Sequence, residues 1–358
     1  MKWRSKRRGS AAIRFGLLVV AAVGGIWVST ARALGETEGS AGGEPPFFAY
    51  LRSCDSRPSL IAFNPSRFDP RRPYPINATS KADIRADLAA LRAAFDGLVL
   101  YQYQPELTPT ILSIAQGLGY KAAVIGLWNP KDANEIDGVA KTVSRFYPDL
   151  ALAVVIGNEG LIENRYSLGD LGQAAERLRA LLPAGVAVPL STSEPIGEYG
   201  IMELRAFGDF LAPNVHPAID QEGSDPATAA AWVRRRARAL ATVAGKPVLV
   251  KETGLPNGGR PAYSPETQRL FWQAYERGGW LDEAGLPAHA WVSFAAAFEA
   301  FDLPWKAERS GMPIEGHWGF LNVDREPYPA FDQWRQTLRS ASPEGAGSDR
   351  GCGGAGAQ

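Results

Sequence analysis

Eight short apolar runs, separated by longer stretches with helical spacing, limit the fold of this chain more than any other feature. Most of the runs lack the polar–apolar alternation of a half-exposed strand, which is typical of strands covered on both faces. The runs are Ser59–Phe63, Gly97–Tyr101, Lys121–Gly126, Ala151–Gly157, Val186–Ser191, Phe210–Val215, Pro247–Lys251 and Ala290–Phe298. Buried strands that alternate with helices are expected to form a parallel sheet with helices on its faces.

The stretches between the runs carry signals for helices. Thr79 or Ser80 can cap a helix whose apolar residues recur at helical spacing over Ile84–Phe95. The same spacing recurs over Leu168–Leu182, and Thr108-Pro109 is read as a cap followed by a first-turn proline. Strand-then-helix units repeated over roughly 280 residues predict an α/β fold, specifically a single (β/α)8 TIM barrel.

The main alternative is a doubly wound sheet, which would favour a glycine-rich fingerprint after the first strand. The first run is followed instead by Asn64-Pro65-Ser66. We therefore expect one barrel domain over residues 58–339. A flexible lead-in over residues 34–57 and a disordered Gly/Ser-rich tail over residues 340–358 are expected to flank it.

Residues 1–33 have the features of a targeting segment. Five basic residues lie within Lys2–Arg8, and an uncharged apolar run of about 14 residues, Phe15–Val28, follows them. That run is short for crossing a bilayer, and Ala31-Arg32-Ala33 offers a small-x-small cleavage site. We expect a cleaved signal peptide or a retained signal anchor. In both cases the domain is exported, and it is periplasmic, secreted or anchored to the outer side of the cell membrane.

Charge and cysteine content narrow the range of partners. Lys+Arg and Asp+Glu both number 38, so nothing indicates a nucleic acid partner. Cys54 and Cys352 form no CxxC pair, and the sequence leaves open whether they form a disulfide with each other. No cluster of residues has the spacing of metal ligands, so no metal or other cofactor is expected. We expect the chain to be a monomer.

Two carboxylates that close apolar runs are the strongest indication of chemistry. Glu159 follows the run that begins at Ala151, and Glu252 follows the run that begins at Pro247. Carboxylates just beyond the carboxyl ends of barrel strands meet at the mouth of the barrel, where such folds carry out chemistry. A facing pair suits glycoside hydrolysis. One carboxyl gives a proton to the leaving oxygen, and the other, ionised, attacks the sugar carbon or activates water.

Polar and aromatic side chains gather at the same predicted end of the barrel, where a sugar could bind. The candidates for substrate binding are Asn158, Tyr101, Trp128, Glu194, His216, Trp305 and Lys306. Flat tryptophan faces suit sugar rings, although both tryptophans could equally pack against loops. Glu194 could instead support a loop, and His216 could be a core histidine. His289 precedes its strand, which favours a structural role, and His317 is either a loop-packing residue or a rim contact.

Several motifs together resemble a known family. They are Gly157-Asn158-Glu159, Glu252–Pro256, Phe298–Asp302, Pro304-Trp305-Lys306 and Gly316–Gly319. In combination they are similar to glycoside hydrolase family 17, and most similar to its bacterial β-1,3-glucanase and glucanosyltransferase branch. The resemblance covers residues 58 to 335.

The resemblance implies a retaining mechanism that proceeds through a covalent glycosyl-enzyme intermediate on β-1,3-glucan. Glu159 matches the acid/base residue of the family and Glu252 its nucleophile. Asn158 matches the residue that hydrogen-bonds the sugar hydroxyl beside the reacting carbon. In retaining enzymes the two carboxyl groups lie about 5–5.5 Å apart, which allows direct attack on the sugar.

Departures from the usual residues of the family occur at Leu255, Asn257, Leu303 and Ala218, and they leave both carboxylates in place. Three functions therefore stay open. The leading one is hydrolysis of a β-glucan polysaccharide or oligosaccharide. The second is transglycosylation with the same residues, because the sequence does not reveal the shape of the acceptor site. The third is a non-catalytic envelope protein that binds glucan, against which the retention of Glu159 and Glu252 argues.

Overall fold

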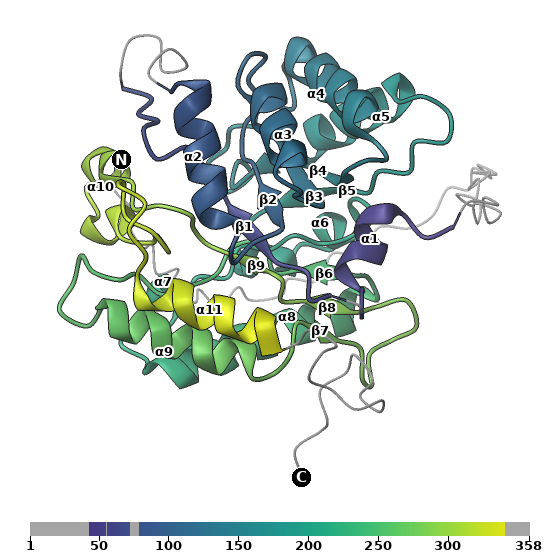
Figure 1. Cartoon of the computed structure of the whole chain (residues 1–358). Coiled ribbons are helices and arrows are strands. Elements are labelled where there is room, and N and C mark those ends of the chain that lie inside the picture. The colour runs from purple at the N-terminus through teal and green to yellow at the C-terminus, as the bar shows by residue number, and fades with distance from the viewer. Residues whose placement is uncertain (1–42, 55, 72–78, 341–358) are drawn as a thin grey trace, which may run out of the picture. The chain divides into compact units, whose positions relative to one another are not determined.

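The computed structural model describes residues 43–54, 56–71 and 79–340 (Figure 1). The described residues from Glu44 onward belong to one compact unit. The predicted targeting segment, residues 1–33, lies outside the described residues, as does most of the predicted tail. Cys352 lies there too, so the question of whether it pairs with Cys54 stays open. The domain boundaries proposed from the sequence likewise stay predictions.

One correction concerns the lead-in. Part of it forms helix α1 (Pro46–Leu51), whose Phe47 and Leu51 side chains are fully buried. The ring of Phe47 lies 6.2 Å from that of Phe210, which belongs to a distant part of the chain. This stretch is therefore part of the folded core, because its apolar side chains belong to the same buried cluster as residues of the strands.

The first five predicted strands are confirmed, with shifted bounds, in a sheet of six parallel strands. The order in this sheet is β5-β4-β3-β2-β1-β9, and every neighbouring pair is parallel. Its members are β1 (Leu60–Ala62), β2 (Gly97–Val99), β3 (Ala122–Leu127), β4 (Ala151–Asn158), β5 (Leu190–Ser193) and β9 (Ala296–Ala297). The sheet forms a half-barrel, and the predicted α/β class is therefore confirmed.

The last three predicted strands are less regular. Ala290–Phe298 divides into β8 (Val292–Ser293) and β9, which belong to different sheets. A second sheet has the order β6-β8-β7, in which β6 (Val248–Leu249) is parallel to β8 and β7 (Leu281–Asp282) is antiparallel to it. The run Phe210–Val215 contributes only isolated bridges, which pair Asn214 with both Pro195 and Glu252, and Leu211 with Val248. Pro213, which has no N–H to donate, interrupts this run.

Helices follow most of the strands. Figure 1 shows α2 to α5 on one side of the strands and α8, α9 and α11 on the other. The helices are α2 (Lys81–Leu91), α3 (Thr108–Gly117), α4 (Ala133–Phe146), α5 (Leu168–Leu181), α6 (Met202–Ala206), α7 (Pro217–Asp220), α8 (Pro226–Ala244), α9 (Pro265–Glu276), α10 (Pro304–Ser310) and α11 (Pro329–Ser340). Short 3-10 helices span Ile196–Gly200 and Pro313–Gly316.

Side-chain caps begin several of these helices, and one predicted cap is wrong. Ser80 caps α2 by accepting from the backbone N–H of Asp83, and Ser167 starts α5 with a capping box. Thr108 is the first helical residue of α3 and not its cap. Its hydroxyl oxygen instead accepts from the backbone N–H of Gln104, which ties the preceding loop to the helix.

The strands place alternate residues in two separate apolar clusters, which explains their uninterrupted apolar character. Ile61, Leu98 and Ile125 belong to a cluster shared with the helices. Leu60 and Val124 belong to a second cluster, on the opposite face of the sheet. Both faces of the strands are thus covered, as the absence of alternation predicted. No helix in the described part of the chain has the length and apolar character needed to cross a bilayer.

Candidate active site

The ends of β4 and β6 bring Glu159 and Glu252 into one hydrogen-bonded network. Glu159 directly follows β4, and Glu252 lies shortly beyond β6. Asn214 links them, because its backbone pairs with that of Glu252 and its Nδ2 donates to Oε1 of Glu159 at 2.8 Å. The same Nδ2 lies 3.2 Å from Oδ1 of Asn158. The two strand ends predicted to carry chemistry therefore meet.

The backbone of Glu159, just beyond β4, has an unusual conformation. Its φ is 54°, in the left-handed region that non-glycine residues seldom adopt, and Gly157 two residues earlier has φ 78°. The pairing of β4 with β5 shifts between Val155 and Asn158. Such strained positions persist only where the surroundings hold them, and they cluster at functional sites. Burial raises the pKa of Glu159, as does the negative charge of Glu252, and the hydrogen bond from Asn214 offsets part of this rise.

Glu252 lies in an environment of opposite charge. Its side chain is buried, and both of its oxygens have basic partners. The ammonium of Lys251 contacts Oε1, and Nε2 of His216 lies 3.3 Å from Oε2. Burial alone would raise the pKa of Glu252, but Lys251 and His216 lower it to about 2. The two neighbouring carboxyls thus have pKa values pushed in opposite directions, which suits one to give a proton and the other to stay ionised.

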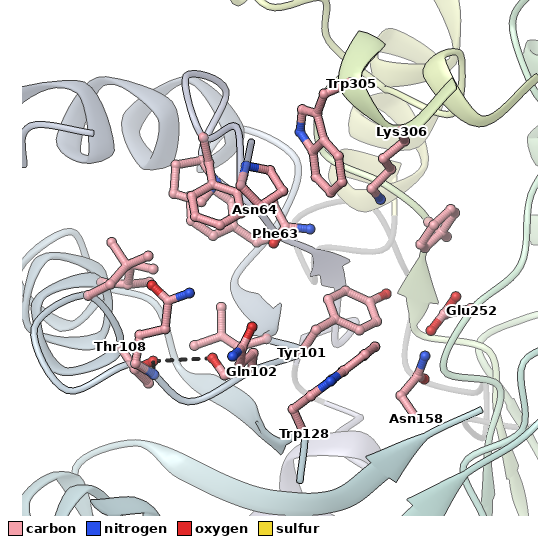
Figure 2. A pocket seen from close by; sticks show the side chains of 18 of the residues that line it. Phe63, Asn64, Tyr101, Gln102, Thr108, Trp128, Asn158, Glu252, Trp305 and Lys306 are labelled. Carbon is pink, nitrogen blue, oxygen red and sulfur yellow. Dashed lines mark hydrogen bonds between the residues drawn. The ribbon is translucent and has the colours of Figure 1, made fainter. Parts of the chain in front are cut away.

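A cavity of about 390 Å³ lies in front of Glu252 (Figure 2). Six of the predicted site residues line it, namely Glu252, Asn158, Tyr101, Trp128, Trp305 and Lys306. The other lining residues are Phe63, Asn64, Pro65, Phe68, Pro70, Leu100, Gln102, Gln104, Leu107, Thr108, Ile111, Phe298 and Arg309. The walls thus combine aromatic surface with amide and basic groups, the mixture expected of a sugar-binding pocket.

Trp128 is held in place on one wall of the cavity. Its backbone N–H donates to Oε1 of Glu135, a residue of α4, at 2.7 Å. The guanidinium of Arg165 lies over its ring, 4.0 Å from the ring centre. The same guanidinium contacts the backbone carbonyl of Asn158. Arg165 therefore connects the tryptophan to the end of β4.

Trp305 and Lys306, at the start of α10, enter the cavity from the side opposite Trp128 (Figure 2). The indole Nε1 of Trp305 is buried and has no hydrogen-bond partner among the described residues. The ammonium of Lys306 donates to Oε2 of the buried Glu299 at 2.5 Å. Burial raises the pKa of Glu299 to about 7, although Lys306 works against this rise.

Three of the predicted site residues, Glu159, Glu194 and His216, lie outside the lining of the cavity. Glu194 is fully buried, and its Oε1 accepts from the backbone N–H of Leu161 at 3.0 Å and from the hydroxyl of Tyr166 at 3.1 Å. This placement corrects the predicted sugar contact, because Glu194 holds the loop after Glu159 instead. His216 contacts Glu252 without lining the cavity, and its ring lies 5.2 Å from that of Trp318.

The two remaining histidines differ in exposure. His289 is exposed, and His317 is half-buried beside Gly258, with its carbonyl accepting from the backbone N–H of Asn257 at 2.7 Å. Neither lines the cavity. In the described ranges, no group of three or more His, Cys, Asp or Glu residues could hold a metal ion.

The sequence around this site matches a known protein family. The family model of the BtgE/BtgC glycoside hydrolase domain matches residues 61–319, which include both carboxylates and all the residues that line the cavity. The chain belongs to the BtgE/BtgC glycoside hydrolase family. It is therefore a glycosidase, as the strand-end glutamates predicted.

Relatives of this BtgE/BtgC glycoside hydrolase support the resemblance to family 17. A glucan 1,3-beta-glucosidase of Arthroderma benhamiae is 26% identical over 235 residues, which cover 61% of this chain and 73% of the relative. The family 17 beta-1,3-glucanosyltransferase of Rhizomucor miehei shares the fold, with a TM-score of 0.58 at 18% identity over 76% of this chain and 96% of that chain. Its active-site mutant in complex with laminaritriose gives a TM-score of 0.57 at 18% identity, with the same coverage.

An endo-laminarinase of Formosa Hel1_33_131 also shares the fold. Its TM-score is 0.59 at 18% identity, and the match covers 81% of this chain and 90% of that chain. Together with the family match, these relatives confirm the family resemblance drawn from the sequence.

Two residues of this glycoside hydrolase site were not among the sequence candidates. Asn214 is 1% exposed and binds Glu159, and its position just before His216 at the end of a predicted strand was the available signal. Glu299 lies in the Phe298–Asp302 motif, but its pairing with Lys306 depends on the course of the chain into α10. Sequence spacing does not reveal such a contact.

Proposed function

We propose that this chain is a retaining glycosidase that cleaves β-1,3-glucan, with Glu159 as acid/base and Glu252 as nucleophile. The observation that carries the proposal is the pair of strand-end carboxyls, joined through Asn214, whose pKa values shift in opposite directions. A (β/α)8 barrel is part of the proposal. The isolated bridges of Leu211 and Asn214, which run between β5 and β6, support closure of the strands into a ring.

The proposed reaction has two steps. In the first, an oxygen of Glu252 attacks the anomeric carbon while Glu159 gives its proton to the departing glycosidic oxygen. Once Glu252 is bound to the sugar it carries no charge, so Glu159 ionises more readily. In the second step Glu159 takes a proton from an incoming hydroxyl, whose oxygen bonds to the anomeric carbon as the bond to Glu252 breaks. Water as acceptor gives hydrolysis, and a sugar hydroxyl gives transfer.

The lining of the cavity and the relatives support a β-1,3-glucan as substrate. Trp128 and Trp305 present aromatic surface from opposite walls, and Asn158 lies beside Glu252 where a sugar hydroxyl would bind. The Arthroderma benhamiae relative is named for a 1,3-linked glucan, and the Rhizomucor miehei mutant binds laminaritriose. These names motivate the choice of linkage for this chain.

Transglycosylation is the second candidate, because one of the structural relatives is a glucanosyltransferase. The same carboxyl pair serves both reactions. The difference lies in whether water or a second sugar reaches the intermediate.

Product sizes test the proposal. The purified chain is incubated with laminari-oligosaccharides of defined length and, as a control, with β-1,4-linked oligosaccharides of the same lengths. Shorter 1,3-linked products support hydrolysis, and longer or branched products support transfer. Turnover restricted to the β-1,4 series would contradict the assigned linkage. Products that form equally with the Glu252→Gln variant would contradict the assigned nucleophile.

A further inference from the structure

Lys251 is a buried cation behind the wall of the cavity. Its side chain is 2% exposed, a degree of burial that lysine rarely reaches without compensating partners. Its ammonium contacts Oε1 of Glu252 and donates to Oδ1 of Asn158 at 2.9 Å. It also lies 4.6 Å over the ring centre of Tyr101. All three partners line the cavity, while Lys251 itself does not.

The contact with Lys251 fixes the orientation of the side-chain amide of Asn158. Oδ1 of Asn158 accepts from two donors, Nζ of Lys251 at 2.9 Å and Nδ2 of Asn214 at 3.2 Å. An amide oxygen has two lone pairs, so both are used here. An ammonium has only hydrogens to offer, so it requires the amide oxygen, and not the amide nitrogen, on its side. The Nδ2 group of Asn158 is thereby left for a ligand in the cavity.

We propose that Lys251 is a positioning residue that acts through two neighbours. It holds Oε1 of Glu252 in place, and it turns the amide of Asn158 so that the N–H groups face the sugar. The inference rests on the proposed function and deepens it, because it explains how one buried side chain orients the attacking carboxylate and a substrate-binding amide together. A neutral side chain at this position would release the amide to rotate and would leave Glu252 without its nearest positive charge.

A purely structural role predicts different behaviour. If Lys251 only neutralised buried charge, its loss would lower stability and leave the recognition of individual sugar hydroxyls unchanged. The positioning role predicts a specific loss of recognition at the hydroxyl beside the reacting carbon, because Asn158 is the residue expected to bind it. Aryl β-laminaribiosides with and without that hydroxyl separate the two roles.

The first test is the Lys251→Met variant, which keeps the length of the side chain and removes its charge. We expect kcat/KM on the complete substrate to fall by about tenfold or more. We expect the preference for the complete substrate over the 2-deoxy substrate to shrink by about tenfold, because Asn158 no longer presents its donor reliably. An unchanged preference for the hydroxyl would overturn the proposal.

The pH profile gives a second readout. Without the positive charge of Lys251, the pKa of Glu252 should rise from its lowered value, so the acidic limb of kcat/KM should move to higher pH. The other titratable groups that interact with Glu252 stay in place in the variant, namely Glu159, His216, Tyr101 and Glu299. An acidic limb at the wild-type position would contradict the proposed contact with Glu252.

Lys246→Met is the matched control. Lys246 is also partly buried, but its ammonium donates to the backbone carbonyls of Ala206 and Gly208, away from the cavity. This variant should keep the wild-type hydroxyl preference and acidic limb, whatever its stability. A control that shifted both readouts as strongly as Lys251→Met would overturn the assignment, since the effect would then not be specific to Lys251.

A stability cycle covers the case in which Lys251→Met folds poorly. Glu252→Gln leaves the ammonium buried without its carboxylate, so adding Lys251→Met to that variant should raise the melting temperature or leave it unchanged. In the wild-type background Lys251→Met should lower it. Equal losses in both backgrounds would show that the two groups are not coupled and would overturn the proposal. The cycle needs no turnover, so it still tests Lys251 if no glucan or glycoside proves to be a substrate.

Discussion

Glu159 and Glu252 are neighbouring carboxyls whose surroundings differ in charge. Glu252 is flanked by Lys251 and His216, whereas the nearest hydrogen bond to Glu159 comes from the neutral amide of Asn214. The difference raises the pKa of Glu159 and lowers that of Glu252, so Glu159 keeps its proton to a higher pH than Glu252 does. It also predicts that substitution of Glu159 and substitution of Glu252 should impair different steps of the reaction.

At the residue scale, the amide variants separate the two roles. We expect Glu252→Gln to lower glucan turnover by about a thousandfold or more, because an amide is a poor nucleophile. We expect Glu159→Gln to lower it by about a hundredfold or more and to spare the first step on an aryl glycoside whose leaving group needs no proton. Added azide should then restore turnover of that aryl glycoside by replacing water.

Steady-state kinetics on both substrates, with detection of the glycosyl azide, checks this prediction. Glu203→Gln serves as control, because Glu203 is an exposed carboxylate on α6 and should keep wild-type rates. Wild-type glucanase activity in Glu159→Gln would contradict its assignment as acid/base.

The sequence indicated these two carboxyls because each follows an apolar run, and that relationship is local. It left open whether Glu194 contacts sugar or supports a loop, and in the structure its carboxylate accepts from Leu161 and Tyr166. Those partners belong to a loop about thirty residues earlier in the chain, so their contact depends on the way β4 and β5 pair. A strand-end position alone does not say whether a side chain faces the cavity.

At the scale of elements, helix α4 supports the wall of the cavity. Its first turn carries Glu135, whose two oxygens accept from the backbone N–H groups of Trp128, Asn129 and Tyr103 at 2.7, 2.8 and 3.3 Å. One buried carboxylate thus joins the loops after β2 and β3. These loops carry Trp128 and Tyr101, so the helix fixes the spacing of two cavity residues.

We expect Glu135→Gln to destabilise the fold by about 1–3 kcal/mol, because the amide NH2 group would face a backbone N–H that needs an acceptor. KM for the glucan should rise more than kcat falls, since the wall that carries Trp128 loosens while Glu159 and Glu252 stay in place. Thermal unfolding and steady-state kinetics measure the two effects. Asp137→Asn, on the same helix at an exposed ion pair with Arg177, should change neither. A Glu135→Gln variant with wild-type stability and KM would contradict the prediction.

Element positions were the most predictable part of the fold. Uninterrupted apolar runs located β1 to β5 to within a few residues, because burial on both faces is encoded in the strand itself. Ala290–Phe298 was expected to be one strand, yet it divides between two sheets. The antiparallel partner β7 was not foreseen. Both outcomes depend on hydrogen bonds to distant segments, which the apolar pattern of a run does not contain.

At the scale of the whole molecule, the described chain from Glu44 onward is one compact unit that contains the cavity in front of Glu252. Glucan polymers are too large to enter a cell freely, so the proposed activity on glucan suits a location where polysaccharide is accessible. The segment that would direct it there, residues 1–33, lies outside the described residues.

We predict that the chain is exported, because a basic stretch, the apolar run Phe15–Val28 and the Ala31-Arg32-Ala33 site follow each other in the order of an export signal. N-terminal sequencing of protein from the cell envelope checks this. A start at Leu34 would indicate cleavage, and an intact N-terminus in membranes would indicate a retained anchor. Leu17→Arg combined with Leu18→Arg should keep the protein in the cytoplasm by interrupting the apolar run. Export of that variant, or a wild-type chain found mainly in the cytoplasm, would contradict the prediction.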